Sequence, residues 1–585
     1  MKRIICTILA ISMLAGCFAG CGGKNDKEYK SVYDFEKSDK VIELTTDRFI
    51  ESEDGMTDWD NDPYIRWCEV NLGIKWKPKF VVASKAEHDQ KLTLLAASGE
   101  LPDVICDAPA YSIREWYESG FLRVLEDDIN KWGSDLTKYV INEEYKKQSN
   151  GNGFAGFTTE DGKYYALPMV LDPSAGDWGK YFYRADILEE LGMKEPTNLK
   201  ELENVLAAYS QKYSGKPAIF LDDFFFTAAA PLFQIFGSYT GMFREVDGQV
   251  VYGSLSPETK TMLATLRDWY KKGYIAKDFT KMKYQTEMDN VAQGDYFLVP
   301  GQQWFPRWIA PKLNAKKSNA RFLPMTNIAD KNGKLNKFYT NFYIQYPAVI
   351  TKNCKHPDAV IKEMNILYES GLRNDKDLRE MGFKFRWPET PLRQPTNADE
   401  VAQKGIKYAK YDYKPEEVGP HFLNQGPTNP VSICYGNANS RSVSYNQIDK
   451  KVVLDTLKNN NYEMKATYDA LPDSFKPWFD NQFISNPEAQ GNPWGCEATL
   501  INSIQIAEDL ASGQIVNDGG WTYAYTGEAY DDYFVPLQDL ERTYFVEIIT
   551  GERPLDDFDQ FVTTWKENGG NEILAEKNEK LASMK

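Results

Sequence analysis

The sequence predicts an α/β protein with at least two lobes. Strand-like and helix-like segments alternate after residue 40, and such alternation favours a largely parallel sheet with helices on its faces. With 585 residues the chain is also longer than one hydrophobic core usually supports. The content of 42% hydrophobic and 26% charged residues is typical of globular proteins, and the net charge of −17 argues against nucleic acid as a partner.

The first sixteen residues have the layout of a secretory signal. Lys2 and Arg3 precede an apolar run over residues 4–14, which is too short to span a bilayer stably, and the small residues Ala15 and Gly16 follow. We therefore expect residues 1–16 to be a signal peptide, and no later apolar stretch is long enough to cross a membrane.

A cysteine follows this signal directly. Residues 14–17 read Leu-Ala-Gly-Cys and resemble the lipobox of bacterial lipoproteins, in which the cysteine is diacylated and becomes the mature N-terminus. Cys17 is the expected lipidation site, and Cys21 is the alternative, although Phe18 replaces the aliphatic residue of its lipobox. The alternative interpretations are an ordinary cleaved signal peptide and a buried N-terminal segment. Because two acyl chains anchor stably, we expect a lipid anchor and flexible spacer over residues 17–40, on the extracellular face of a bacterial membrane.

The body begins with a β-α-β-α-β pattern. Strands are predicted over Val41–Thr45, Ile74–Val82 and Leu101–Ile105. Helices are predicted between them, over Asp62–Leu72 and Glu87–Ser98. This order indicates parallel strands joined by crossover helices.

Ligands of such sheets bind outside the carboxyl ends of the strands. The loops after the first and third strands are therefore candidate ligand sites, and they contain residues 48–51, Asp107 and Tyr111. The plainer interpretation of each residue is a solvated loop position or a helix cap.

Further elements follow in the same manner. Short strands are predicted over residues 163–168 and Lys180–Tyr183. A helix over Asp186–Gly192 ends at its glycine, and another begins within residues 196–202 with Thr197 or Asn198 as its cap.

The cysteines and histidines argue against two kinds of chemistry. Beyond the anchor no CxxC pair occurs, so a disulfide framework or a thiolate metal site is not expected, and the scattered thiols suit small buried hydrophobes. The three histidines have no acid or nucleophile at a recognisable spacing, which argues against histidine-based catalysis.

Six segments stand in the order in which they occur in a known family. They are residues 94–105 (LLAASGELPDVI), 164–168 (YYALP), 183–192 (YRADILEELG), 269–279 (WYKKGYIAKDF), 548–551 (IITG) and 565–570 (WKENGG). On these segments the chain strongly resembles the extracellular solute-binding proteins of ABC importers, in particular the large lipoprotein members associated with carbohydrate uptake.

This resemblance implies a two-lobed, periplasmic-binding-protein-like α/β fold with a hinge and a ligand cleft between the lobes. We expect the first crossing near residues 162–167 and the second near residues 322–324, with a third within residues 371–400. The expected N-lobe comprises residues 41–162 and 322–385, and the expected C-lobe comprises residues 163–321 and 386–585.

A sugar site needs aromatic platforms with carboxylate and amide partners, because carbohydrates present apolar faces and a rim of hydroxyls. Three clusters could supply such groups, and their candidate ligand-binding residues are Asp172 and Trp178, Trp304 and Trp308, and Trp521. Packing between elements is the plainer interpretation for any single one of them. Trp76, Trp269 and Trp565 have ordinary core spacing and are not candidates.

A calcium loop is the weaker cofactor hypothesis. Asp58, Asp60, Asp62 and Glu69 fit the spacing of calcium ligands, but Pro63 stands where the sharp turn needs glycine. Helix-capping acids explain them better, so no cofactor is expected.

The leading functional hypothesis is a monomeric, non-enzymatic receptor that captures an oligosaccharide. It would deliver this ligand to ABC permease subunits driven by a separate ATPase, since the chain has no phosphate-binding glycine loop. The alternatives are a surface glycoside hydrolase with paired carboxylates, and a binding protein for a peptide or another small solute.

Overall fold

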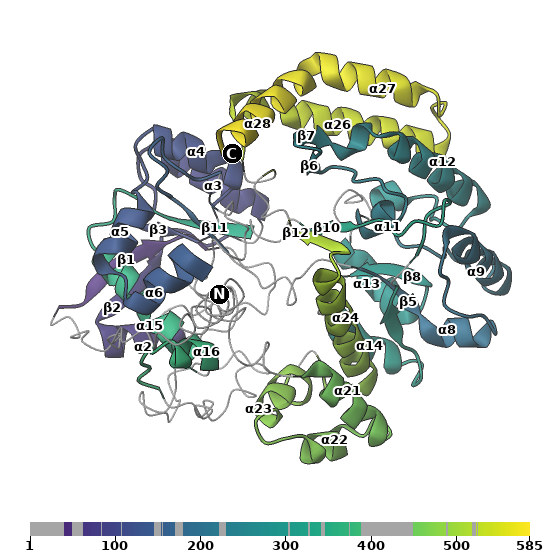
Figure 1. The fold of residues 1–585 in the computed structure, drawn as a ribbon, viewed down its shortest axis with the longest axis horizontal. Helices are drawn as coiled ribbons and strands as arrows, with labels where there is room; N and C mark the ends of the chain where they lie inside the picture. The colour runs from purple at the N-terminus through teal and green to yellow at the C-terminus, as the bar shows by residue number, and fades with distance from the viewer. Residues whose placement is uncertain are drawn as a thin grey trace, which may run out of the picture.

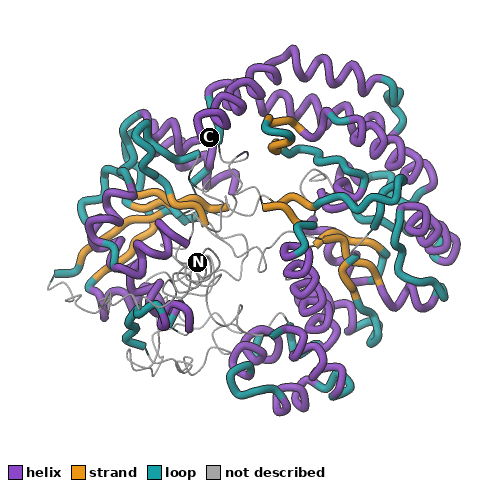
Figure 2. The backbone as a smooth tube through the Cα atoms, viewed as in Figure 1, coloured by secondary structure: helices purple, strands orange, loops and turns teal. Residues whose placement is uncertain are grey.

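The computed structural model describes residues 40–48, 63–82, 85–106, 108–144, 154, 156–169, 180–221, 230–282, 284–301, 305–325, 328–340, 345–373, 375–387, 449–486, 489–517, 522 and 525–584. Two α/β bodies, here called the first and second lobe, lie side by side, and further helices adjoin the second (Figures 1 and 2). Across these ranges, each helix falls short of the length and apolar character that crossing a membrane requires.

The first lobe is built on a five-stranded sheet of order β2-β1-β3-β11-β4. Its strands are β1 (Ile42–Thr46), β2 (Ile74–Pro78), β3 (Val104–Ile105), β4 (Leu167–Met169) and β11 (Gln345–Ile350). β1 is parallel to β2 and β3, so the predicted β-α-β start of the fold is confirmed. β11 lies antiparallel to β3 and β4, which makes the sheet mixed.

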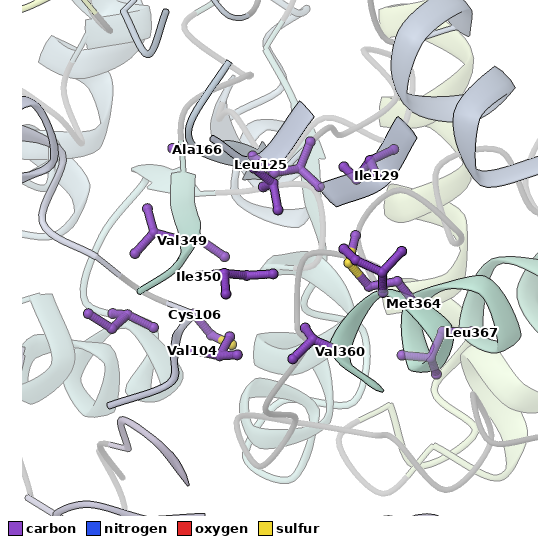
Figure 3. Close-up of a cluster of buried hydrophobic side chains, with 14 of the residues drawn as sticks. Val104, Cys106, Leu125, Ile129, Ala166, Val349, Ile350, Val360, Met364 and Leu367 are labelled. Carbon is purple, nitrogen blue, oxygen red and sulfur yellow. The ribbon is translucent and has the colours of Figure 1, made fainter. Parts of the chain in front are cut away.

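Helices cover this sheet and complete the first core. They are α2 (Pro63–Leu72), α3 (Lys85–Ala97), α4 (Ala110–Glu118), α5 (Leu125–Trp132), α6 (Asp135–Tyr139), α15 (Pro357–Leu372) and α16 (Lys376–Glu380), with a π-helical turn over Val140–Glu144. Figure 3 shows side chains from β3, β11 and α15, among them Val104, Ile350 and Val360, in one cluster. β3 and most of β11 are apolar, as expected of strands covered by helices, whereas β1 (IELTT) and β2 (IKWKP) alternate apolar and polar residues.

A glutamate lies inside this apolar core. Glu363 of α15 is 1% exposed and accepts hydrogen bonds from the Tyr64 hydroxyl and, at 2.8 Å, from Trp76 Nε1. Burial raises the pKa of Glu363 to about 7, and the hydrogen bonds offset part of this rise.

The second lobe has a three-stranded antiparallel sheet of order β8-β5-β9. The strands are β5 (Lys180–Arg184), β8 (Leu298–Gly301) and β9 (Phe322–Pro324). The surrounding helices are α8 (Ala185–Glu190), α9 (Leu199–Lys212), α11 (Ala230–Ile235), α12 (Pro257–Lys272), α13 (Tyr284–Gln293) and α14 (Phe305–Asn314). A hairpin of β6 (Phe243–Val246) and β7 (Gln249–Tyr252) leads into the short 3-10 helix Gly253–Leu255, and a second 3-10 helix spans Phe279–Lys281.

The start of α9 distinguishes the two predicted caps. Asn198 is the cap, because its side-chain oxygen accepts a hydrogen bond from the backbone N–H of Glu201 at 3.0 Å. Thr197 instead donates its hydroxyl to the Glu201 carboxylate at 2.8 Å. The two residues thus form reciprocal contacts with Glu201, as in a capping box.

Three C-terminal helices pack on the second lobe. They are α26 (Glu528–Thr550), α27 (Asp557–Trp565) and α28 (Asn571–Met584), with a π-helical turn over Lys566–Gly570. Trp565 stacks on Tyr252 with ring centroids 4.7 Å apart. Glu541 of α26 is 1% exposed and accepts hydrogen bonds from Tyr252 Oη, at 2.6 Å, and from Ser254. Burial raises the pKa of Glu541 to about 7.

A further group of helices lies beside α14. It consists of α21 (Lys450–Asn459), α22 (Met464–Ala470), α23 (Lys476–Phe479), the π-helical turn Asp480–Ile484 and α24 (Pro493–Ala511). α24 packs along α14, where Gly495 lets the two backbones approach closely, since an added Cβ would lie 3.0 Å from the Arg307 Cα. After α24, β12 (Ile515–Asn517) pairs in parallel with β10 (Phe338–Thr340).

The expected lobe boundaries need correction at both ends of the second lobe's first segment. Residues 164–167 belong to the first core, whereas the sequence predicts that the second lobe begins at residue 163. Strand β9 pairs with β5 of the second lobe, and β10 pairs with β12, so the return to the first lobe follows residue 340 rather than residue 322. Short apolar strands have the same sequence pattern in either sheet, and strand pairing alone assigns them.

The core tryptophans and thiols agree with the sequence predictions. Trp76, Trp269 and Trp565 are at most 1% exposed. Within the described part of the chain, Cys68, Cys106, Cys354 and Cys496 are free and buried, while Cys434 lies outside it.

Candidate functional site

Most of the predicted site residues lie outside the described ranges. They are Asp107, Asp172, Trp178, Trp304, Trp521 and the lipidation candidates Cys17 and Cys21. Their described neighbours in sequence lie at strand ends: Cys106 follows β3, Lys180 begins β5 and Gly301 ends β8. Lys180 and Gly301 are register partners, so the chain enters β5 and leaves β8 at the same edge of the second sheet.

Two predicted site residues fall within described helices. Tyr111 lies in the first turn of α4, just after β3, and its side chain is outside the described set. Trp308 lies on α14, where its half-buried ring packs against a core cluster of the second lobe. Lys312 Nζ lies 3.7 Å from the centroid of this ring, one turn further along the helix.

The carboxyl ends of β1 and β3 are joined by Asp47. One carboxylate oxygen of Asp47 accepts the backbone N–H of Cys106 at 2.9 Å. The other oxygen lies 2.9 Å from His88 Nε2. Asp47 thus fixes the chain immediately before Asp107, at the strand ends where a ligand is expected in a sheet of this kind.

His88 lies between two carboxylates, although the sequence shows no acid at a recognisable catalytic spacing from any histidine. Its ring is fully buried, and its Nδ1 lies 3.0 Å from Asp89 while its Nε2 faces Asp47. With both ring nitrogens against carboxylates, the imidazole is suited to holding the loop after β1 rather than to acting as a general base. Asp47 lies 41 positions earlier, a separation that no local motif reveals.

The corresponding edge of the second lobe contains a buried ion pair. Lys180 Nζ, at the start of β5, lies 2.7 Å from Asp509 Oδ2 of α24, and both side chains are less than 10% exposed. Gln505 donates its amide to the other Asp509 oxygen at 2.9 Å. Burial lowers the pKa of Lys180, and Asp509 opposes this shift. The pair ties α24 to the edge of the sheet, a contact that the sequence analysis missed.

Asn502 lies two turns before Asp509 on α24 and is also buried. It is 0% exposed, and neither its amide nitrogen nor its oxygen has a hydrogen-bond partner in the described structure. A buried amide without partners loses its hydration and gains no hydrogen bond in return.

We therefore expect Asn502→Leu to raise the free energy of unfolding, by about 1–3 kcal/mol. Urea denaturation of the purified protein measures this change. The matched control is Asn365→Leu, because Asn365 is also buried but accepts the Ser134 N–H at 2.8 Å and donates to the Trp132 carbonyl at 3.0 Å. Asn365→Leu should destabilise the protein, and an equal loss in Asn502→Leu would contradict the prediction.

An ion pair connects the two lobes. Arg114 of α4 donates a hydrogen bond from Nη2 to Asp531 of α26, and its Nη1 lies 3.2 Å from Glu118. Among hydrogen bonds and ion pairs made between described residues, the Arg114–Asp531 pair is the one that crosses from one lobe to the other.

The residues of the possible calcium loop are only partly described by the structure. Asp58, Asp60 and Asp62 lie outside the described residues, whereas the Glu69 carboxylate in α2 lies 4.0 Å from Lys75 Nζ. In the ranges given above, no group of three or more His, Cys, Asp or Glu side chains could hold a metal ion.

Comparisons with known proteins agree with this architecture. Residues 73–362 match the model of a family described as bacterial extracellular solute-binding protein. The alginate-binding protein AlgQ2, solved without calcium ion, is similar with a TM-score of 0.58 and 16% identity, over 95% of this chain and 100% of that one. The S. pneumoniae ABC-transporter substrate-binding protein FusA, an EF-hand mutant in complex with fructo-nystose, has a TM-score of 0.53 and 15% identity, over 93% and 99%. No curated protein matches the sequence.

Proposed function

Because the chain belongs to the bacterial extracellular solute-binding proteins, we propose that it captures an oligosaccharide between its two lobes and delivers it to an ABC permease. The observation that supports this function is the fold. The similarity to an alginate-binding protein covers 95% of the chain, and the similarity to a protein in complex with fructo-nystose covers 93%. A two-lobed body with a hinge can close around a ligand and present the closed form to a partner.

The ligand site of this proposal lies between the sheet edges of the two lobes. Asp107 and Tyr111 would contribute from the first lobe, and Asp107 follows Cys106, whose backbone N–H donates to Asp47. The second lobe would contribute Asp172, Trp178, Trp304, Trp308 and Trp521. Flat aromatic rings suit the apolar faces of sugar rings, and carboxylates and amides suit the hydroxyls.

The family acts outside the cytoplasm, and a tether would keep this chain there at the permease. Cys17 is the proposed lipidation site and Cys21 the alternative, because both follow lipobox-like residues. Mass spectrometry of the N-terminal peptide from membrane-extracted protein distinguishes diacylated Cys17 from diacylated Cys21. An N-terminal peptide without acyl chains would contradict the anchor but leave the binding function untouched.

A screen of the mature body against oligosaccharides tests the proposed function. A ligand that binds only the folded protein stabilises it by about 2.7 kcal/mol at a concentration one hundred times its dissociation constant, which raises the melting temperature. We expect such a rise with one class of oligosaccharide, and alginate and fructo-oligosaccharides are the first to be tested, with calorimetric titration to confirm binding. The control ligands are a peptide mixture and simple monosaccharides.

The same samples distinguish a receptor from a glycoside hydrolase. We propose a protein that binds without catalysis, so chromatography after long incubation should return each oligosaccharide at its original length. Shortened products would favour the hydrolase, since paired carboxylates cleave glycosidic bonds. A thermal shift with the peptide mixture alone would favour a different cargo.

A further inference from the structure

The Arg114–Asp531 pair joins two rigid elements of different lobes. α4 is held in the first lobe through Ile113 and Trp116, which belong to its core. α26 is held in the second lobe through Phe534 and Leu537. Because both ends are anchored in a core, a change in the distance between the lobes must change the distance between the guanidinium and the carboxylate.

Two tyrosines accompany the ion pair at the same place. Tyr165, at the entry to β4 in the first lobe, stacks on Tyr117 of α4 with centroids 4.1 Å apart. Tyr525 belongs to the second lobe, three residues before α26. Burial raises the pKa of both tyrosines, and the charge of Arg114 opposes this rise in each. The Arg114–Asp531 ion pair, with Tyr165 beside α4 and Tyr525 before α26, is here called the cluster between the lobes.

Lys577 fixes the second-lobe side of this cluster. Its ammonium group is fully buried and donates hydrogen bonds to the backbone carbonyls of Thr522, at 2.7 Å, and Tyr525, at 2.6 Å. The rings of Phe243 and Tyr530 lie 4.6 Å and 4.8 Å from its Nζ, a distance at which aromatic faces attract a cation. α28 thus holds the chain just before α26 in one position.

We propose that this cluster is the closing contact of the two lobes, in which Lys577 positions Tyr525 and Asp531 so that Asp531 pairs with Arg114 as the lobes close. The inference rests on the proposed function, since it concerns closure around a ligand. None of these residues needs to touch the ligand. A contact between the lobes that stabilises the closed form increases the fraction of the protein that is competent to bind. The apparent affinity for the ligand rises in proportion.

The size of the effect follows from the exposure of the pair. The side chains of Arg114 and Asp531 are 25% and 29% exposed, so solvent screens their attraction in part. We expect Arg114→Gln and Asp531→Asn each to weaken ligand binding by about three- to tenfold, mainly through faster dissociation. The double exchange Arg114→Asp with Asp531→Arg should recover part of the loss.

A matched control lies within the second lobe. Arg553 Nη2 is 2.6 Å from Glu547 Oε2, and these side chains are 26% and 31% exposed, nearly as in the proposed closing contact. Arg553→Gln removes an ion pair of the same exposure without changing any contact between the lobes. It should leave ligand affinity unchanged.

The decisive measurement needs no ligand. Small-angle scattering of the unliganded protein should show a larger radius of gyration in Arg114→Gln and Asp531→Asn than in the wild type and Arg553→Gln. Equal radii in all four proteins would overturn the closing contact, whatever the ligand. If no oligosaccharide binds the wild type while the radii differ, the proposed function fails and the closing contact stands.

Lys577→Met tests the positioning role. The methionine keeps most of the length of the side chain but removes the donors, so the variant should lose affinity as Asp531→Asn does. In the combined variant, Asp531→Asn should then have little further effect, because its carboxylate is already misplaced. Additive losses would contradict a positioning role, and hydrogen exchange of residues 522–531 shows whether that segment alone has loosened.

Discussion

Replacing Asp509 with alanine should lower the free energy of unfolding by roughly 3–5 kcal/mol, because it leaves the buried ammonium of Lys180 without its counter-charge. The ion pair has an N···O distance of 2.7 Å, and the two side chains are 7% and 9% exposed, so water cannot take the place of the carboxylate. Urea denaturation followed by circular dichroism measures the loss, which should appear in the transition of the second lobe.

The double variant Lys180→Met with Asp509→Leu separates the charge from the packing. Removal of both charges removes the desolvation cost of both, and apolar replacements of buried ion pairs are often neutral or stabilising. We expect this variant to recover most of the stability that Asp509→Ala loses. If Asp509→Ala stays within about 1 kcal/mol of the wild type, the pair is accessible to solvent and the prediction is wrong.

Replacing Glu363 or Glu541 with glutamine should remove a large part of the pH dependence of stability. Burial raises the pKa of each carboxyl from 4.5 to about 7, so each folded carboxyl keeps its proton where the unfolded one loses it. The stability that these groups contribute is complete below pH 4.5 and is lost as the pH rises through about 7. This rise of the pKa corresponds to a change in the free energy of unfolding on the order of 3 kcal/mol per carboxyl group.

Denaturation of the wild type and both variants at pH 5, 6, 7 and 8 tests this prediction. Glutamine stays neutral, so relative to the wild type each variant should gain on the order of 3 kcal/mol between pH 5 and pH 8. The two substitutions should act independently, because Glu363 lies in the first core and Glu541 contacts Tyr252 in the second. A constant difference between variant and wild type over this range would show that the carboxyls are ionised in the folded protein throughout.

Local pattern was enough for much of the fold. The alternation of strand and helix between residues 41 and 105 predicted β1, α2, β2, α3 and β3, since hydrophobic periodicity records which face of an element is buried. The predicted cap of α9 and the core tryptophans were found for the same reason. The lobe boundaries could not be predicted in this way. β4, β9 and β10 have three residues each, and their sequences do not indicate which strand they pair with.

The residues of the candidate site could be predicted from local sequence less well than the fold. Aromatic composition and loop position suggested Trp178, Trp304 and Trp521, and these lie outside the described residues. The groups that the structure brings together are His88 with Asp47, Lys180 with Asp509, and Arg114 with Asp531. Nothing near any of these residues in the chain marks its partner, since an isolated aspartate is normally a solvated residue.

The sequence by itself determined the class of the fold, the family resemblance and the expectation of a lipid-anchored receptor, because helix and strand periods, turn residues and short motifs are local properties. Tertiary structure alone decided which charges are buried, which strands share a sheet and where the lobes meet. Those features join residues that are 329 and 417 positions apart in the case of the two ion pairs. Such contacts depend on the packing of whole elements, and no local pattern encodes them.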